Sequence, residues 1–199
     1  MKKAALIVFV ILVADQALKF WIKTSFYMGE SRPVFGQWFL LHFTENEGMA
    51  FGMRLGGSYG KLLLSLFRIV AVVILTIWLY RVTRKGASNL LIFCISLILA
   101  GALGNIIDSA VYGLIFSEST YMQIAAFLPE AGGYGTFLHG KVVDMLYFPV
   151  INTRFPAWMP VWGGEEFVFF RPVFNLADSS ITTGVLVLIL FQRKVFAQK

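Results

Sequence analysis

Cysteine, histidine and charged residues are scarce in this sequence. Its 199 residues include one cysteine, Cys94, and two histidines, and only 14% are charged. A disulfide framework needs paired cysteines, and a structural zinc site needs several cysteine or histidine ligands, so both are excluded. We expect neither a metal nor a cofactor, and we interpret Cys94 as a small buried apolar residue.

Apolar residues are in excess, at 58% of the chain. A soluble domain of ordinary composition contains fewer. Four apolar runs are long enough to cross a hydrocarbon core of ~30 Å as helices, at about 4–21, 62–80, 89–107 and 174–191. The sequence therefore predicts an α-helical integral membrane protein, with one domain over 1–199 and four transmembrane helices.

Acidic residues are missing from the N-terminal segment, from the connection between the second and third apolar runs, and from the C-terminal segment. Eight basic residues occur there without an acid: Lys2, Lys3, Arg81, Arg84, Lys85, Arg193, Lys194 and Lys199. Short basic segments stay in the cytoplasm, so both termini are predicted to be cytoplasmic and the two long connections to lie outside. The net charge of +6 follows from this rule, and we infer no nucleic-acid partner from it.

The two outer connections have different patterns. Residues 29–59 are rich in aromatic and branched residues around a turn-like segment, 44–48, which predicts a small outer β-sheet. The exposed edge of such a sheet could hold an extended peptide by strand addition. Residues 109–172 are too many for a loop without structure, and their aromatic residues and prolines predict a structured outer loop at the membrane boundary.

Ionisable and amide side chains occur at the predicted outer ends of the helices. Asp178 opens the fourth apolar run, and Asp144 lies between the last two runs. A carboxylate at membrane depth is costly and therefore marks a candidate functional site. Asn105 and Asp108 share a helix face, which we expect to face the same cavity as Asp178.

Asp15 and Lys19 are four residues apart on the first predicted helix, so they can pair near its outer end. Two interpretations remain open for this pair. It is either a structural ion pair with a snorkelling lysine or a direct participant in the chemistry.

Five groups of these residues resemble, in their order along the chain, the motifs of bacterial lipoprotein signal peptidase, also called signal peptidase II. The resemblance covers nearly the whole chain. The matching groups are Asp15 with Lys19, Asn46-x-Gly48-x-Ala50-Phe51, Gly104-Asn105-x-x-Asp108, Val143-Asp144 and Phe174-Asn175-x-Ala177-Asp178-x-x-Ile181.

The resemblance implies an aspartic endopeptidase of the bacterial inner membrane with an active site near the outer face. It implies that Asp144 and Asp178 are the catalytic pair, and it assigns substrate-binding or supporting roles to Asp15, Lys19, Asn46, Gly48, Asn105, Asp108 and Asn175. The implied substrate is a prolipoprotein that carries a diacylglyceryl group on its cysteine and is cut just before that cysteine. Inhibition by globomycin-type peptide antibiotics is implied as well, and the phospholipid bilayer is the other partner.

The chain departs from the family pattern at Ser109, where an arginine is usual. We therefore expect the ion pair beside Asp108 to be missing and Lys141 or Arg171 to compensate for it. The outer connection also has extra sequence, at about 117–140 and 148–171.

The chemistry of two adjacent carboxyl groups follows from charge repulsion. They cannot both ionise cheaply, so one keeps a proton while the other activates water. Two other function classes stay open. A proton-coupled transporter would use Asp108, Asp144 and Asp178 as a relay, and a non-enzymatic membrane assembly factor would use the acids only as structural ion pairs.

Overall fold

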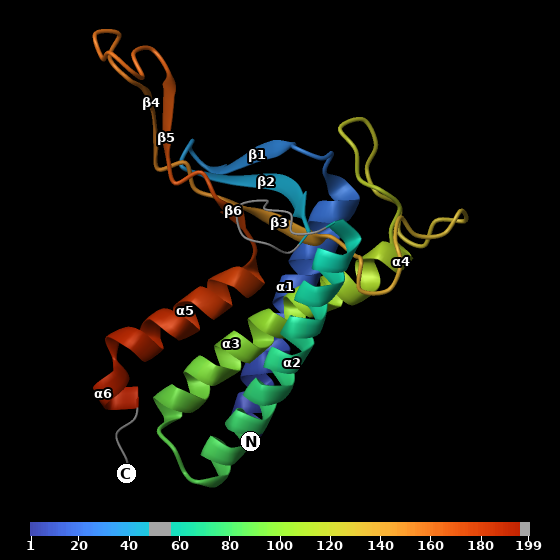
Figure 1. The fold of residues 1–199 in the computed structure, drawn as a ribbon, viewed down its shortest axis with the longest axis vertical. Coiled ribbons are helices and arrows are strands. Elements are labelled where there is room, and N and C mark those ends of the chain that lie inside the picture. Colours follow the sequence, from blue (N-terminus) through green and yellow to red (C-terminus); the bar gives the residue numbers. More distant parts are fainter. Residues whose placement is uncertain (48–56, 196–199) are drawn as a thin grey trace.

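The computed structural model describes residues 1–47 and 57–195, with long helices on one side of a small antiparallel sheet (Figure 1). The elements follow in this order: α1 (Lys2–Ser25), β1 (Ser31–Phe35), β2 (Phe39–Asn46), α2 (Gly57–Arg84), α3 (Asn89–Ile107), a π-helical turn η2 (Asp108–Tyr112), α4 (Gly113–Ile115), β3 (Val142–Tyr147), β4 (Ile151–Arg154), β5 (Glu166–Phe169), β6 (Val173–Phe174), α5 (Leu176–Leu190) and α6 (Gln192–Val195).

Within the described residues, three helices are long and apolar enough to cross a membrane: Lys2–Ser25, Tyr59–Arg84 and Asn89–Ile115. They contain the first three predicted runs. Such runs become helices because hydrocarbon offers backbone amides no other hydrogen-bond partner. The fourth run forms α5, which has 15 residues and is shorter than a usual span of about 20.

The helix α3 lies at the centre of the bundle. In its most apolar stretch 56% of residues are buried, against 17% in α1 and 11% in α2. The helix α3 turns a glycine toward α5, because a Cβ atom at Gly101 would overlap the backbone of Ala177 on α5. A Cβ atom at Gly184 of α5 would lie 2.8 Å from the carbonyl oxygen of Cys94. Glycine at both positions therefore lets α3 and α5 approach closely.

The sheet is larger than the segment 29–59 in which it was expected. Its strand order is β1-β2-β3-β6, so two of its four strands come from residues C-terminal to α3. Strand β2 pairs with β3 in antiparallel register, with Thr44 opposite Asp144 and Asn46 opposite Val142. Asp144 therefore lies on an inner strand, and β6 leads directly into α5 (Figure 1).

The connection between α3 and α5 has its own structure. Its first part folds back on the end of α1, where Phe20 packs against Phe116 and Phe127, and the amide of Met28 donates to the carbonyl oxygen of Thr120. Its second part is the β4–β5 hairpin, which projects away from the helices (Figure 1).

We expect Gly101→Ala to destabilise the protein by about 1–3 kcal/mol, because the new methyl group would push α5 away from α3. Thermal unfolding in detergent would measure the change. Leu190→Ala is a suitable control, since Leu190 is 71% exposed at the end of α5. An unfolding temperature of Gly101→Ala equal to that of the control would contradict close packing of α3 on α5.

Candidate active site

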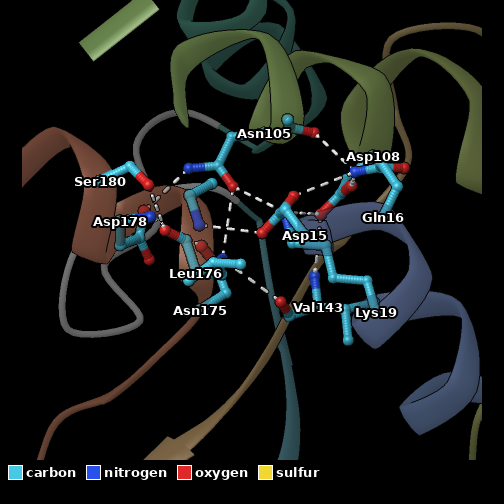
Figure 2. Close-up of polar contacts among 12 residues, drawn as sticks. Asp15, Gln16, Lys19, Asn105, Asp108, Val143, Asn175, Leu176, Asp178 and Ser180 are labelled. Carbon is cyan, nitrogen blue, oxygen red and sulfur yellow. Dashed lines mark hydrogen bonds and ion pairs between the residues drawn. The ribbon is translucent and has the colours of Figure 1, made fainter. Parts of the chain in front are cut away.

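Polar side chains from α1, α3, η2, β2, β3 and the start of α5 meet at one end of the helices (Figure 2). The sequence-predicted residues Asp15, Lys19, Asn46, Asn105, Asp108, Asp144, Asn175 and Asp178 all belong to this connected group. Gly48 lies outside the described residues. Among the residues that the structure describes, no three acids, histidines or cysteines are placed to hold a metal ion.

Asp178 is held by the geometry of a helix start. Asn175 is the N-cap of α5, and its side-chain oxygen accepts a hydrogen bond of 2.8 Å from the amide of Asp178. This bond satisfies one of the free amides of the first turn, where the helix dipole also favours a carboxylate. Asn105 of α3 donates to Asp178 Oδ1 at 2.8 Å. The half-buried carboxyl group of Asp178 is therefore fixed from two elements.

Asp144 projects from the middle of β3 and is only 3% exposed. Its two oxygens accept hydrogen bonds from two amides, with Asn175 Nδ2 donating to Oδ1 at 2.7 Å and Asn46 Nδ2 donating to Oδ2. Asn175 thus contacts Asp144 through its nitrogen and caps the helix turn of Asp178 through its oxygen. One side chain links the two acids.

Burial, and after it the nearby charge of Asp178, raises the pKa of Asp144 to about 8. The hydrogen bond from Asn175, the charge of Lys19 and the hydrogen bond from Asn46 oppose this shift. A carboxyl group with this pKa keeps its proton at neutral pH. In this form the Asp144 carboxyl group has a proton to donate.

Lys19 lies between two other carboxylates, and its side chain is completely buried. Its Nζ atom is 2.9 Å from Asp15 Oδ2 and 2.8 Å from Asp108 Oδ2, and it donates to Asn105 Oδ1 at 3.0 Å. The expectation that Asp108 lacks an ion pair was therefore wrong. The long stem of Lys19 carries its charge from α1 to η2, so Asp108 has an ion pair although position 109 is a serine.

The two bases considered as substitutes lie elsewhere. Lys141 Nζ contacts Glu118 Oε1 at 3.1 Å, and Arg171 donates to the carbonyl oxygen of Glu166 at 3.2 Å. Neither contact involves Asp108.

Asp15 and Asp108 also hold the backbone beside the two central acids. Asp15 Oδ1 accepts from the amide of Ala177 at 2.9 Å, and Asp108 Oδ2 accepts from the amide of Val143 at 3.3 Å. Ala177 precedes Asp178, and Val143 precedes Asp144. The ion-paired layer around Lys19 therefore supports both central acids through their neighbours.

Sequence reasoning missed Gln16 in this group. Its side-chain nitrogen donates to Asp108 Oδ1 at 2.9 Å and to Asp15 Oδ2 at 3.2 Å, and its oxygen accepts from the hydroxyl group of Tyr112 at 3.2 Å. The signal was present, because an amide beside an acid inside an apolar run needs a polar partner.

A second buried ion pair, between Lys23 and Glu45, was also missed. Lys23 Nζ donates to Ser119 Oγ at 2.9 Å as well, which ties α1 to β2 and to the connection after α4. Glu45 directly precedes Asn46. Lys23 follows Lys19 by four residues, so it lies on the same face of α1 as the first ion pair.

Comparisons with known proteins agree on one family. The family model described as "Signal peptidase (SPase) II" matches residues 7–193. A lipoprotein signal peptidase of Porphyromonas gingivalis is 52% identical over 98% of this chain and 84% of its own, and one of Amoebophilus asiaticus is 37% identical over 94% and 75%.

Solved structures give the same result for the fold. A bacterial membrane enzyme determined by the in meso method at 1.9 Å resolution has a TM-score of 0.62 and 26% identity, and the match covers 98% of this chain and 94% of that one. A second such enzyme, at 2.3 Å resolution, has a TM-score of 0.63 at 24% identity over 98% and 90%.

We expect Lys19→Met to destabilise the protein by about 3–5 kcal/mol, because it leaves two buried carboxylates without their cation. Denaturant unfolding in detergent would measure the loss. Lys141→Met should cost under about 1 kcal/mol, because its partner Glu118 is 62% exposed and its more distant partner Glu45 remains paired with Lys23. The Asp15→Asn, Lys19→Met, Asp108→Asn triple variant should recover stability, and a triple variant no more stable than Lys19→Met would contradict the charge argument.

Proposed function

The chain belongs to the signal peptidase II family, and from this premise we propose that it removes signal peptides from lipid-modified prolipoproteins by aspartic catalysis. Family membership makes it a lipoprotein-processing peptidase of a bacterial membrane. The observation that carries the aspartic mechanism is the link between Asp144 and Asp178 through Asn175, together with the raised pKa of Asp144.

The proposed reaction uses one proton held by the pair. Asp178, as the carboxylate, takes a proton from water while the water oxygen attacks the scissile carbonyl carbon. Asp144, which is protonated at neutral pH, gives its proton to the carbonyl oxygen as that carbon becomes tetrahedral. When the C–N bond breaks, the proton on Asp178 passes to the leaving nitrogen and the hydroxyl proton returns to Asp144. The products are a carboxyl group and an amine, and the pair ends in its starting state.

Asn46, Asn105 and Asn175 serve this pair as positioning residues, because each donates a hydrogen bond to one of its carboxyl groups. Asp15, Lys19 and Asp108 form the layer behind them. We assign Gly48 a role near the substrate on the resemblance alone.

We also propose that the chain crosses the inner membrane four times, with both termini in the cytoplasm. The acid-free basic segments support this orientation. A helix of 15 residues is about 22 Å long and spans less than a ~30 Å hydrocarbon core. With its C-terminal end at the cytoplasmic boundary, α5 would begin several ångströms below the outer surface. Asp178 would then meet a scissile bond close to the end of a signal helix.

The proposed substrate follows from the family and fits this depth. The signal helix and the acyl chains of a diacylglyceryl-modified precursor can remain in lipid while the bond before the modified cysteine reaches the two acids. Globomycin-type peptides are proposed to inhibit by occupying the same place. The relay of a proton-coupled transporter is less well supported, since Asp108 is bound to Lys19, Gln16 and the backbone of Val143.

Asp144→Asn and Asp178→Asn should each abolish cleavage, by about 10³-fold or more, because each removes one partner of the proton exchange. The assay is cleavage of a diacylglyceryl-modified precursor by purified protein in detergent. Glu30→Gln is a control, since Glu30 pairs with the exposed Arg32 away from the site. Near-normal cleavage by either Asp variant would refute the assignment, and equal cleavage of an unlipidated precursor would refute the substrate.

The pH dependence gives a separate test of the roles. Above the pKa of Asp144, near 8, the general acid loses its proton, so kcat/KM should fall by about tenfold for each further pH unit. The measurement is kcat/KM for the lipidated precursor between about pH 6 and pH 10 in a non-ionic detergent, with the folded state of the protein checked at each pH. A rate that stays level to the alkaline end would mean that Asp144 is not the acid.

A further inference from the structure

An apolar groove runs along the basic end of the bundle, between α1 and α2. Its volume is about 570 Å³. One wall is formed by Ala5, Val8 and Phe9 of α1, and the other by Ile77 and Tyr80 of α2. Phe9 is 64% exposed and Tyr80 50% exposed, so the groove is open on the side that faces lipid.

The groove follows from how the helices pack. Both α1 and α2 pack mainly against α3 and only weakly against each other. The floor contains the buried residues Ala4, Leu79 and Leu99, one from each helix. The small side chains of Ala4 and Ala5 keep the space between the walls open.

The length of the groove matches one leaflet. Its lining on α1 extends from Met1 to Leu12, and eleven helical steps cover about 16 Å. This is about half of a ~30 Å hydrocarbon core. In the proposed orientation, the groove reaches from the cytoplasmic boundary to the middle of the bilayer and ends one turn before Asp15.

The mouth of the groove is positively charged. Lys2 and Lys3 lie at the start of α1, and Arg81 and Arg84 lie on the last turn of α2, four and seven residues after Ile77 and thus on its face. The sequence has no acid in residues 1–14 or 48–107. Within the part of the chain that the structure describes, none of these four cations is paired with an acid.

Water does not fill such a space well, because an ordered water needs two to four polar partners and the lining is apolar. We propose that the α1–α2 groove binds one acyl chain of an anionic phospholipid of the inner leaflet, whose headgroup contacts the basic mouth. The site is separate from the candidate active site, so it adds a lipid ligand to the proposed function.

The test is native mass spectrometry of the full-length protein with phosphatidylglycerol and phosphatidylcholine of identical acyl chains. We expect the wild-type protein to retain the anionic lipid roughly tenfold better. Arg81→Gln with Arg84→Gln should remove most of this preference. Arg193→Gln with Lys194→Gln removes the same charge near α6 and should leave it unchanged (Figure 1).

Groove-filling variants test the acyl chain separately from the headgroup. Ala5→Phe puts a ring into the groove and should reduce retention of both lipids several-fold, whereas Leu6→Phe, at a position 62% exposed and outside the lining, should not. Both variants should cleave precursor at the wild-type rate, because the groove is separate from the candidate active site. Failure of the wild-type protein to cleave would count against the proposed function, whereas the lipid retention tests only this site.

Three results would overturn the lipid site. They are equal retention of the two lipids by the wild-type protein, an equal loss in the two double variants, and equal retention by Ala5→Phe and Leu6→Phe. Displacement of bound phosphatidylglycerol by one equivalent of lipidated precursor would also overturn it, because the groove would then hold the signal helix.

Discussion

The buried charge of Lys19 is the constraint on which the polar region depends. Two carboxylates, from Asp15 and Asp108, lie in a bundle that is otherwise apolar, and burying them without a cation would cost several kcal/mol each. Lys19 contacts both, and each carboxylate also accepts from a backbone amide, Asp15 through its other oxygen and Asp108 through the same oxygen. Those amides belong to Ala177 and Val143, so the ion pairs position the start of α5 and the middle of β3.

The polar contacts fall into two groups. Lys19 places its positive charge between the carboxylates of Asp15 and Asp108. The three asparagines then hold the carboxyl groups of Asp144 and Asp178 by hydrogen bonds. Asp144 is the acid whose environment favours the neutral form, because it is buried on an inner strand and accepts its hydrogen bonds from the neutral amides of Asn175 and Asn46. A nearby cation would favour its ionised form. The charge of Lys19 lowers the pKa of Asp144 but does not outweigh burial and the charge of Asp178.

Much of this arrangement could be predicted from the sequence. Apolar runs long enough for a bilayer identified the helices, and Asp15, Asn105 and Asp178 were identified because polar groups at membrane depth are rare. The contribution of β3 and β6 to the sheet could not be predicted, since pairing between residues about a hundred positions apart leaves no local pattern. The second contact of Lys19 was missed for the same reason, because helical spacing indicates Asp15 but not a residue on another helix.

Asn175 shows why the residue types at this site are so restricted. Its oxygen accepts from the amide of Asp178, and its nitrogen donates to Asp144. A serine or threonine could cap the helix but is too short to donate to Asp144 at the same time, and an aspartate could cap it but has no donor when ionised. An ionised aspartate would also add a negative charge beside the pair. Only an amide of this length meets both requirements without changing the charge, so the start of α5 positions both acids through one side chain.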